Sequence, residues 1–140
     1  MQKPHYTVVA AVIIKSENGV KKIFCAQRPG PKPGKDLNET HFKWEFPGGK
    51  IEQGETREQA LTREIWEEFE AKIEVEDFLT TVNHEYESFS ITMHVFYCTL
   101  LEGRLNLKEH LDSKWLESGE LMSVDWAAAD APVALLCATN

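Results

Sequence analysis

The stretch that decides the fold runs from Gly49 to Ala71 and reads GKIEQGETREQALTREIWEEFEA. Thr56 and Gln59 in its middle have the spacing of a capping box, with Thr56 as the N-cap and Gln59 at position N3. Apolar side chains then recur four residues apart, at Leu61, Ile65 and Phe69. This spacing gives a helix one apolar stripe. The stretch therefore predicts a turn followed by a helix that ends near residue 69.

Three carboxylates share one face of this helix. Glu64, Glu67 and Glu68 stand at positions i, i+3 and i+4, which a helical turn brings to the same side. Most acidic faces are simply solvated, but this one lies beside the apolar stripe, where like charges repel more strongly unless a cation is present. Carboxylate oxygens suit Mg²⁺ or Mn²⁺. The preceding Gly48-Gly49 pair also allows a backbone carbonyl to point at a metal at low steric cost.

Composition narrows the class of protein. The chain has 140 residues and is 42% hydrophobic, so we expect a single domain, residues 1–140, with its own core. Fifteen Lys and Arg against 23 Asp and Glu give a net charge of −8, which argues against a nucleic acid polymer as partner. Any phosphate compound that the protein handles should be small and metal-bound. The cysteines are odd in number and far apart, so no disulfide framework or zinc site is indicated.

No targeting segment is apparent in the sequence. The first residues, MQKPH, run straight into a strand-like segment and lack the apolar stretch of a signal peptide. No apolar run approaches the length of a membrane helix. We therefore expect a cytoplasmic protein without a membrane partner, and the sequence leaves its oligomeric state open.

Strands surround the predicted helix. The pair Asn18-Gly19 indicates a hairpin between strands at 7–15 and 22–27, and a Pro-rich and Gly-rich loop follows at 29–41. Further strands are expected at 42–46, 73–75, 78–82, 91–100, 105–107 and 114–116. Two helical stretches follow residue 120, and the second begins near Asp130. Strands interrupted by one long helix, with a helix at the end, predict an α+β or α/β sandwich.

The same stretch resembles a known family motif. Gly49, Glu55 and the run Arg63-Glu64-Ile65-Trp66-Glu67-Glu68 match the Nudix box, Gly-x5-Glu-x7-Arg-Glu-U-x-Glu-Glu-x-Gly-U, over residues 49–71. The chain resembles the MutT and CTP pyrophosphohydrolase branch of the Nudix hydrolases over nearly its whole length. The resemblance implies an α/β fold, the Nudix-type α/β/α sandwich with a mixed β-sheet. Glu70 departs from the motif, because it stands where the family has a glycine that leaves the helix in a left-handed conformation.

The resemblance also implies a reaction, the Mg²⁺-dependent hydrolysis of a nucleoside triphosphate to the monophosphate and pyrophosphate. The implied metal ligands are the Gly48 carbonyl and the carboxylates of Glu64, Glu67, Glu68 and Glu109. Bound metal would polarise the phosphates and activate the water that attacks the β-phosphorus. Glu64 is the first candidate for the general base and Glu109 the second. Arg63 and Glu55 resemble the pair whose salt bridge holds the box rigid.

Four residues are implied to bind the substrate: Arg28 the phosphates, and Phe46, Tyr86 and Asp130 the base. Core packing is the alternative role for the two aromatic residues. In the CTP pyrophosphohydrolase branch the position of Asp130 is Asp, whereas the MutT enzyme that clears 8-oxo-dGTP has Asn. A carboxylate accepts a hydrogen bond from the cytosine amino group. This favours (d)CTP or related pyrimidine nucleotides, unless Asp130 is only a helix N-cap.

Three other functions remain to be weighed. The nearest is an 8-oxo-dGTP diphosphatase, because Asp also occurs in Nudix enzymes that read oxidised purines. A non-catalytic nucleotide-binding module is another, although such proteins usually lose box carboxylates that this chain keeps. Hydrolases of ADP-ribose or NADH tend to carry additional segments for which 140 residues leave little room.

Overall fold

A seven-stranded mixed sheet forms the centre of the computed structural model, which describes residues 2–139. Its strands are β1 (His5–Glu17), β2 (Val20–Gln27), β3 (Trp44–Glu45), β4 (Gly48–Lys50), β5 (Lys72–Glu85), β6 (Ser90–Glu102) and β7 (Asp112–Leu116). The helices are α1 (Arg57–Phe69), the 3-10 helix η1 (Ser118–Ser123) and α2 (Ala131–Ala138). The main path of the sheet is β3-β2-β1-β6-β5, with β4 paired to β1 and β7 to β2. β1 and β6 run parallel, and the other named pairs are antiparallel.

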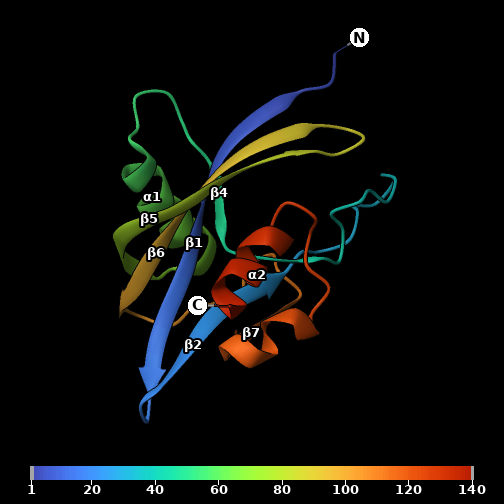
Figure 1. Cartoon of the computed structure of the whole chain (residues 1–140). Helices are drawn as coiled ribbons and strands as arrows, with labels where there is room; N and C mark the ends of the chain where they lie inside the picture. Colours follow the sequence, from blue (N-terminus) through green and yellow to red (C-terminus); the bar gives the residue numbers. More distant parts are fainter. Residues whose placement is uncertain (1, 140) are drawn as a thin grey trace.

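Alternate side chains of β1 build two cores, one on each face of the sheet. Val9, Ala11 and Ile13 belong to the core that contains Leu61, Ile65 and Phe69 of α1. Ala10 and Val12 belong to the core that contains Val133, Ala134 and Cys137 of α2. The two helices lie on opposite sides of the sheet (Figure 1). The fold is therefore the predicted α/β/α sandwich with a mixed sheet.

The hairpin turn and the helix capping box predicted from the sequence are both present. Asn18 and Gly19 both have positive φ, 51° and 80°, and they connect β1 to β2 as a tight hairpin. At the start of α1, the Gln59 backbone N–H donates to the Thr56 hydroxyl, and the Thr56 N–H donates to the Gln59 side chain. The capping box is thus complete, and it fixes where α1 begins.

The structure corrects three of the expected elements. The strand expected at 42–46 is only Trp44–Glu45, because Phe42 has a φ of 65° and cannot extend it. The strand expected at 105–107 is irregular chain whose Asn106 N–H donates to the Phe69 carbonyl at the end of α1. The strands expected at 73–75 and 78–82 are one strand, β5, with β-bulges in its pairing to β6.

All three cysteines, Cys25, Cys98 and Cys137, are buried and free. Among the described residues, no helix is long and apolar enough to cross a membrane.

Candidate active site

A cavity of about 600 Å³ opens beside β1, β4 and α1. Eight of the residues singled out from the sequence line it: Arg28, Phe46, Gly48, Glu64, Glu68, Tyr86, Glu109 and Asp130. Carboxylates and the glycine turn form one end, and aromatic side chains with Asp130 form another part of its wall. A volume of this size is typical of sites for small organic ligands.

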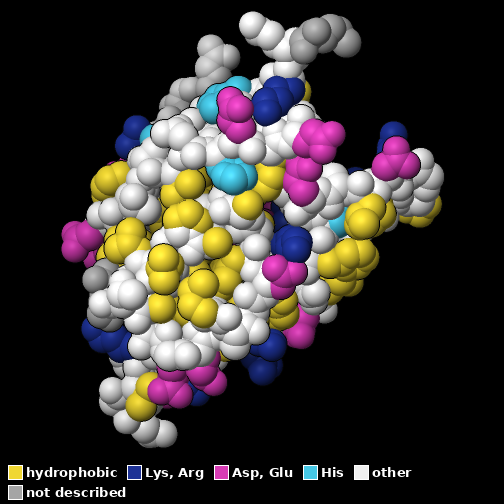
Figure 2. Space-filling model, turned by 45° about the vertical axis from the view of Figure 1, so that its right-hand side comes forward, with side chains coloured by type: hydrophobic (Ala, Val, Ile, Leu, Met, Phe, Trp, Pro, Cys, Tyr) yellow, Lys and Arg dark blue, Asp and Glu magenta, His cyan; other side chains and the backbone are white. Residues whose placement is uncertain are grey.

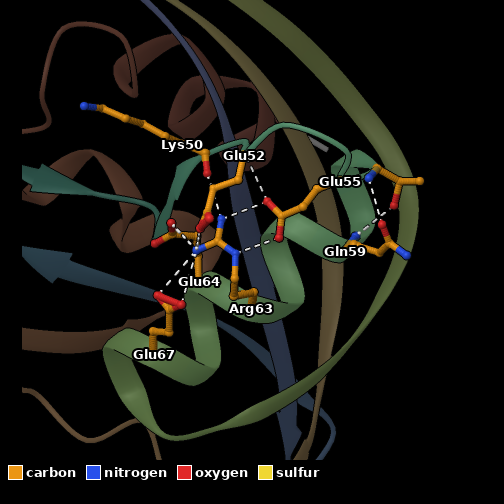
Figure 3. Close-up of polar contacts among 8 residues, drawn as sticks. Lys50, Glu52, Glu55, Gln59, Arg63, Glu64 and Glu67 are labelled. Carbon is orange, nitrogen blue, oxygen red and sulfur yellow. Dashed lines mark hydrogen bonds and ion pairs between the residues drawn. The ribbon is translucent and has the colours of Figure 1, made fainter.

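Arg63 lies beside the cavity at the centre of a polar cluster (Figure 3). Its Nε and Nη2 atoms donate to the two carboxylate oxygens of Glu55 at 2.7 and 2.9 Å, and Nη2 also donates to the Lys50 carbonyl at 3.0 Å. The hydrogen bonds from Arg63 lower the pKa of the Glu55 carboxyl. The bidentate ion pair between Arg63 and Glu55 links the turn before α1 to the helix, which fits the supporting role expected for both residues.

The glycine turn is shaped by close approach. A Cβ on Gly48 would collide with the Val9 carbonyl of the neighbouring β1, and a Cβ on Gly49 would collide with the Glu64 carboxylate. Gly48 thus allows β4 to pair with β1, whereas Gly49 leaves room for an acidic side chain. Only glycine fits these two neighbours without a shift.

Several carboxylates gather at this end of the cavity. Burial raises the pKa of Glu64. Burial also raises the pKa of Glu68 to about 7, a shift that His110 opposes and that the carboxylates of Glu45, Glu64 and Glu109 increase. A divalent cation would relieve this repulsion, and carboxylates are the ligands that Mg²⁺ and Mn²⁺ prefer. The donor set therefore fits a divalent metal.

The carboxylates are not in a closed ligand arrangement. Within residues 2–139, no three His, Cys, Asp or Glu side chains converge as a metal-holding group. Glu67 does not line the cavity, and its carboxylate instead lies 3.3 Å from Arg63, which also contacts Glu64 at 2.9 Å. The three glutamates share a helix face, as the spacing predicted, but Glu67 has to turn away from Arg63 before it can join Glu64 and Glu68 around one ion.

The sequence reading missed Glu45 and His110 among the residues that line the cavity. Glu45 accepts from Arg28 at 3.2 Å with one oxygen and contacts Nε2 of His110 at 2.9 Å with the other. His110, next to Glu109, also stacks on Phe69 of α1 with ring centroids 5.2 Å apart. Glu45 thus links the arginine expected to bind phosphate to the loop that carries Glu109. Its position beside the Pro-Gly-Gly turn was the only local signal.

Asp130 is buried at the start of α2, where its side chain caps nothing. Its Oδ2 accepts from the Phe46 N–H at 3.0 Å, which links segments 84 residues apart. Asp130 therefore occupies the N-cap position, as expected, but its side chain makes no capping hydrogen bond, so capping alone does not account for it. Burial, with a further contribution from nearby Glu45, raises the pKa of Asp130 well above its ordinary value. The carboxyl can therefore keep its proton and act as a hydrogen-bond donor.

Phe46 and Tyr86 line the cavity but are buried, with 3% and 6% of their surfaces exposed. Phe46 stacks on Trp126 with ring centroids 4.6 Å apart. The Tyr86 hydroxyl accepts from the Ala129 N–H at 2.9 Å. Core packing, the alternative considered for both residues, accounts for most of their surface.

The comparisons agree with this geometry. The NUDIX domain family matches residues 4–137. The chain is similar to the CTP pyrophosphohydrolase of Escherichia coli (strain K12), with 32% identity over 126 residues, 90% of this chain and 86% of that protein. It is also similar to the 8-oxo-dGTP diphosphatase of Proteus vulgaris, with 37% identity over 111 residues, 78% of this chain and 89% of that protein.

A solved structure supports the same relationship. The solution structure of MutT, a Nudix hydrolase from methicillin-resistant Staphylococcus aureus 252, is 38% identical. It aligns with 99% of this chain and 98% of its own, with a TM-score of 0.72. The aligned region thus includes both cores and the residues that line the cavity.

Proposed function

The chain belongs to the Nudix hydrolase family, and from this premise we propose that it hydrolyses nucleoside triphosphates to the monophosphate and pyrophosphate, favouring (d)CTP or related pyrimidine nucleotides. The observation that carries the proposal is the shared cavity, in which box carboxylates stand at one end and Asp130 stands on the wall. We also propose that residues 1–140 act as one domain, since both cores share the same sheet.

We assign the roles as follows. Gly48, Glu64, Glu67, Glu68 and Glu109 would hold Mg²⁺ or Mn²⁺, which would supply positive charge to the phosphates and lower the pKa of a bound water. Arg28 binds a phosphate oxygen from the cavity wall, with its guanidinium oriented by Glu45. Glu64 takes the proton of the attacking water, with Glu109 as the second candidate. Arg63 and Glu55 keep the turn and the helix in register.

Asp130 supports the choice of base. One carboxyl oxygen is taken by the Phe46 N–H, so the other is available to the ligand. When ionised, that oxygen accepts from the cytosine amino group. When protonated, it donates to an acceptor such as guanine O6, and the raised pKa of Asp130 is the specific observation that favours 8-oxo-dGTP as the second candidate.

The test is a comparison of kcat/KM for dCTP, dUTP, dGTP and 8-oxo-dGTP in wild type and in Asp130→Ala. If Asp130 reads the base, the variant loses about ten- to a hundredfold on the preferred nucleotide, the cost of leaving one buried polar group unpaired. The other nucleotides should lose much less. A uniform loss would remove Asp130 from the specificity argument, and lack of hydrolysis of all four by wild type would contradict the proposed function.

Repeating the comparison with Asp130→Asn between pH 5 and 9 separates the two candidate substrates. If the ionised carboxylate reads cytosine, the wild-type ratio of dCTP to 8-oxo-dGTP hydrolysis rises with pH. The same ratio in Asp130→Asn should stay flat, because the amide does not titrate. The sign of the preference then decides between the two substrates: a wild-type kcat/KM that is higher for 8-oxo-dGTP than for dCTP at neutral pH would favour the second candidate.

A further inference from the structure

Two aromatic side chains on the cavity wall keep more exposed surface than Phe46 and Tyr86. Tyr6 near the start of β1 and Phe89 at the tip of the β5–β6 hairpin both line the cavity, and neither is fully buried. Their ring centroids lie 5.7 Å apart with an angle of 59° between the planes. The parallel pairing of β1 with β6 brings them together from opposite halves of the chain.

Phe46 and Tyr86 have little ring surface left for a ligand. Trp126 covers one face of Phe46 at an angle of 21°. Tyr86 contacts the ring of His84 at 4.5 Å and that of Phe89 at 4.8 Å, while its hydroxyl is held by Ala129. Phe89 also contacts Tyr86, and Lys50 lies over the Tyr6 ring, but both Phe89 and Tyr6 keep exposed surface that Phe46 and Tyr86 lack. Stacking requires such an open ring face.

The hairpin tip is held in place before any ligand arrives. The Tyr86 N–H donates to the Phe89 carbonyl at 2.8 Å, which closes the turn. Nζ of Lys3 donates to the Tyr86 carbonyl at 2.6 Å and ties the tip to the N-terminal segment. A rigid aromatic wall loses little conformational freedom when it binds a planar group.

Lys50 links the two aromatic rings, Tyr6 and Phe89, to the end of the cavity that carries the carboxylates. Its ammonium lies 4.1 Å from the centre of the Tyr6 ring, and Lys50 follows directly after Gly48-Gly49 in β4. A ligand with a planar aromatic group at one end and phosphates at the other would meet Phe89 and Tyr6, then Lys50, and then the box carboxylates. Figure 2 shows that the surface of the molecule also gathers hydrophobic side chains near the middle of one face, with most charged side chains around its edge.

We propose that Phe89 and Tyr6, rather than Phe46 and Tyr86, form the surface on which the nucleobase stacks. The inference rests on the proposed function, because it requires a nucleotide ligand. It assigns affinity for the base to these two rings, because stacking tolerates every base. Asp130 then chooses among the bases that are held there.

The variants that test this wall remove the ring and keep an apolar side chain. Phe89→Leu and Tyr6→Leu lose the aromatic face, whereas Phe89→Trp restores one. Phe78→Leu is the matched control, because Phe78 is 51% exposed, packs on Phe96 and does not line the cavity. Melting temperatures of all four variants report any loss of folding.

Binding of dCMP, dGMP and pyrophosphate is measured by titration calorimetry, and kcat and KM for dCTP are measured in parallel. Phe89→Leu and Tyr6→Leu should each weaken binding of both monophosphates and raise the KM for dCTP about tenfold, the loss expected for one base–aromatic stack, while pyrophosphate binding stays within about twofold. Phe89→Trp should bind the monophosphates as wild type does.

Two results would overturn the assignment of the wall. One is unchanged binding of dCMP and dGMP in both leucine variants. The other is an equal loss of pyrophosphate binding, which would mean that the hairpin only supports the cavity. If wild type binds pyrophosphate but neither monophosphate and hydrolyses no nucleoside triphosphate, the proposed function fails together with this inference.

Discussion

Glu68 faces the cavity among other carboxylates, and burial with this repulsion raises its pKa to about 7. Glu68→Gln keeps the shape of the side chain and removes the charge that a metal ion requires. We expect Mg²⁺-dependent turnover to fall by at least about a hundredfold, beyond the loss typical of a residue that only supports a ligand. The melting temperature should be unchanged or higher, because repulsion is relieved.

The control for this substitution is Glu58→Gln in the first turn of the same helix, where Glu58 does not line the cavity. That variant should keep wild-type turnover. Turnover of Glu68→Gln within a few-fold of wild type at saturating Mg²⁺ would count against Glu68 as a ligand.

The adjacent glycines allow a second test at the scale of single residues. A Cβ at position 49 meets the mobile end of the Glu64 side chain, whereas a Cβ at position 48 meets backbone atoms of β1. Gly49→Ala should therefore fold normally and lose activity, because the Glu64 carboxylate is displaced. Gly48→Ala should lose stability, by about 2 kcal/mol or more, because the β1–β4 pairing must move.

Urea unfolding and kcat measured on both variants separate these outcomes. If Gly49→Ala remains fully active, the position of the Glu64 carboxylate is not critical for turnover. If Gly48→Ala unfolds at the same urea concentration as wild type, β4 can move away from β1 at little cost.

The end of α1 is decided by one residue that does not suit its conformation. Glu70 has φ 53° and ψ 37°, and its N–H donates to the Trp66 carbonyl at 2.9 Å, so the helix leaves through a left-handed residue as the family pattern implied. A side chain there costs about 1–2 kcal/mol relative to glycine. Glu70 also pairs with Lys108 at 3.6 Å, but both side chains are largely exposed, so the pair contributes little.

Glu70→Gly should therefore raise the free energy of unfolding by about 1 kcal/mol, reduced by whatever the pair with Lys108 contributes. Glu70→Ala is the matched control, because it loses the same pair and keeps the strained conformation. In denaturant titrations the Glu70→Gly variant should be more stable than the Glu70→Ala variant by about 1 kcal/mol. Equal stability of the two variants would show that the left-handed conformation costs nothing at this position.

Elements governed by neighbours in sequence were predictable, and those governed by distant contacts were not. The capping box of α1, the Asn18-Gly19 hairpin and the Arg63–Glu55 pair lie within about one or two turns of chain, so residue types and spacing are enough. The stretch at 105–107 has the alternation of a strand, but its Asn106 N–H is taken by the end of α1. Nothing local marks that contact.

The same distinction applies to the candidate site. Family spacing placed the implied metal ligands and Arg28, and all but Glu67 of these line the cavity. Glu45, His110, Tyr6 and Phe89 join the cavity only through strand pairing and loop packing between distant segments. The contact between Asp130 and the Phe46 N–H also joins distant segments. The sequence neighbours of Asp130 suggested a helix cap and gave no sign of this contact.

At the scale of the whole molecule, Asp130 makes stability depend on pH. Its carboxyl joins α2 to the chain between β3 and β4, and burial raises its pKa well above the ordinary value of an aspartate, with Glu45 adding to the shift and Arg28 opposing it. Above the pKa of the unfolded chain, the unfolded state gives up this proton while the folded state keeps it. The free energy of unfolding must then fall as pH rises, until the folded carboxyl also ionises.

Asp130→Asn should remove this dependence on pH. The amide oxygen can still accept from the Phe46 N–H, but the amide cannot ionise. The variant should be close to wild type in stability near pH 4. Its advantage should grow as the pH is raised, by at most about 1.4 kcal/mol per pH unit, the limit for one titrating group. Urea unfolding of both proteins between pH 4 and 8 measures this difference directly, and other titrating groups cancel because the two chains share them. A difference that stays constant over the whole range would mean that Asp130 ionises alike in the folded and unfolded chain, and the protonated carboxyl would then no longer support 8-oxo-dGTP as a substrate.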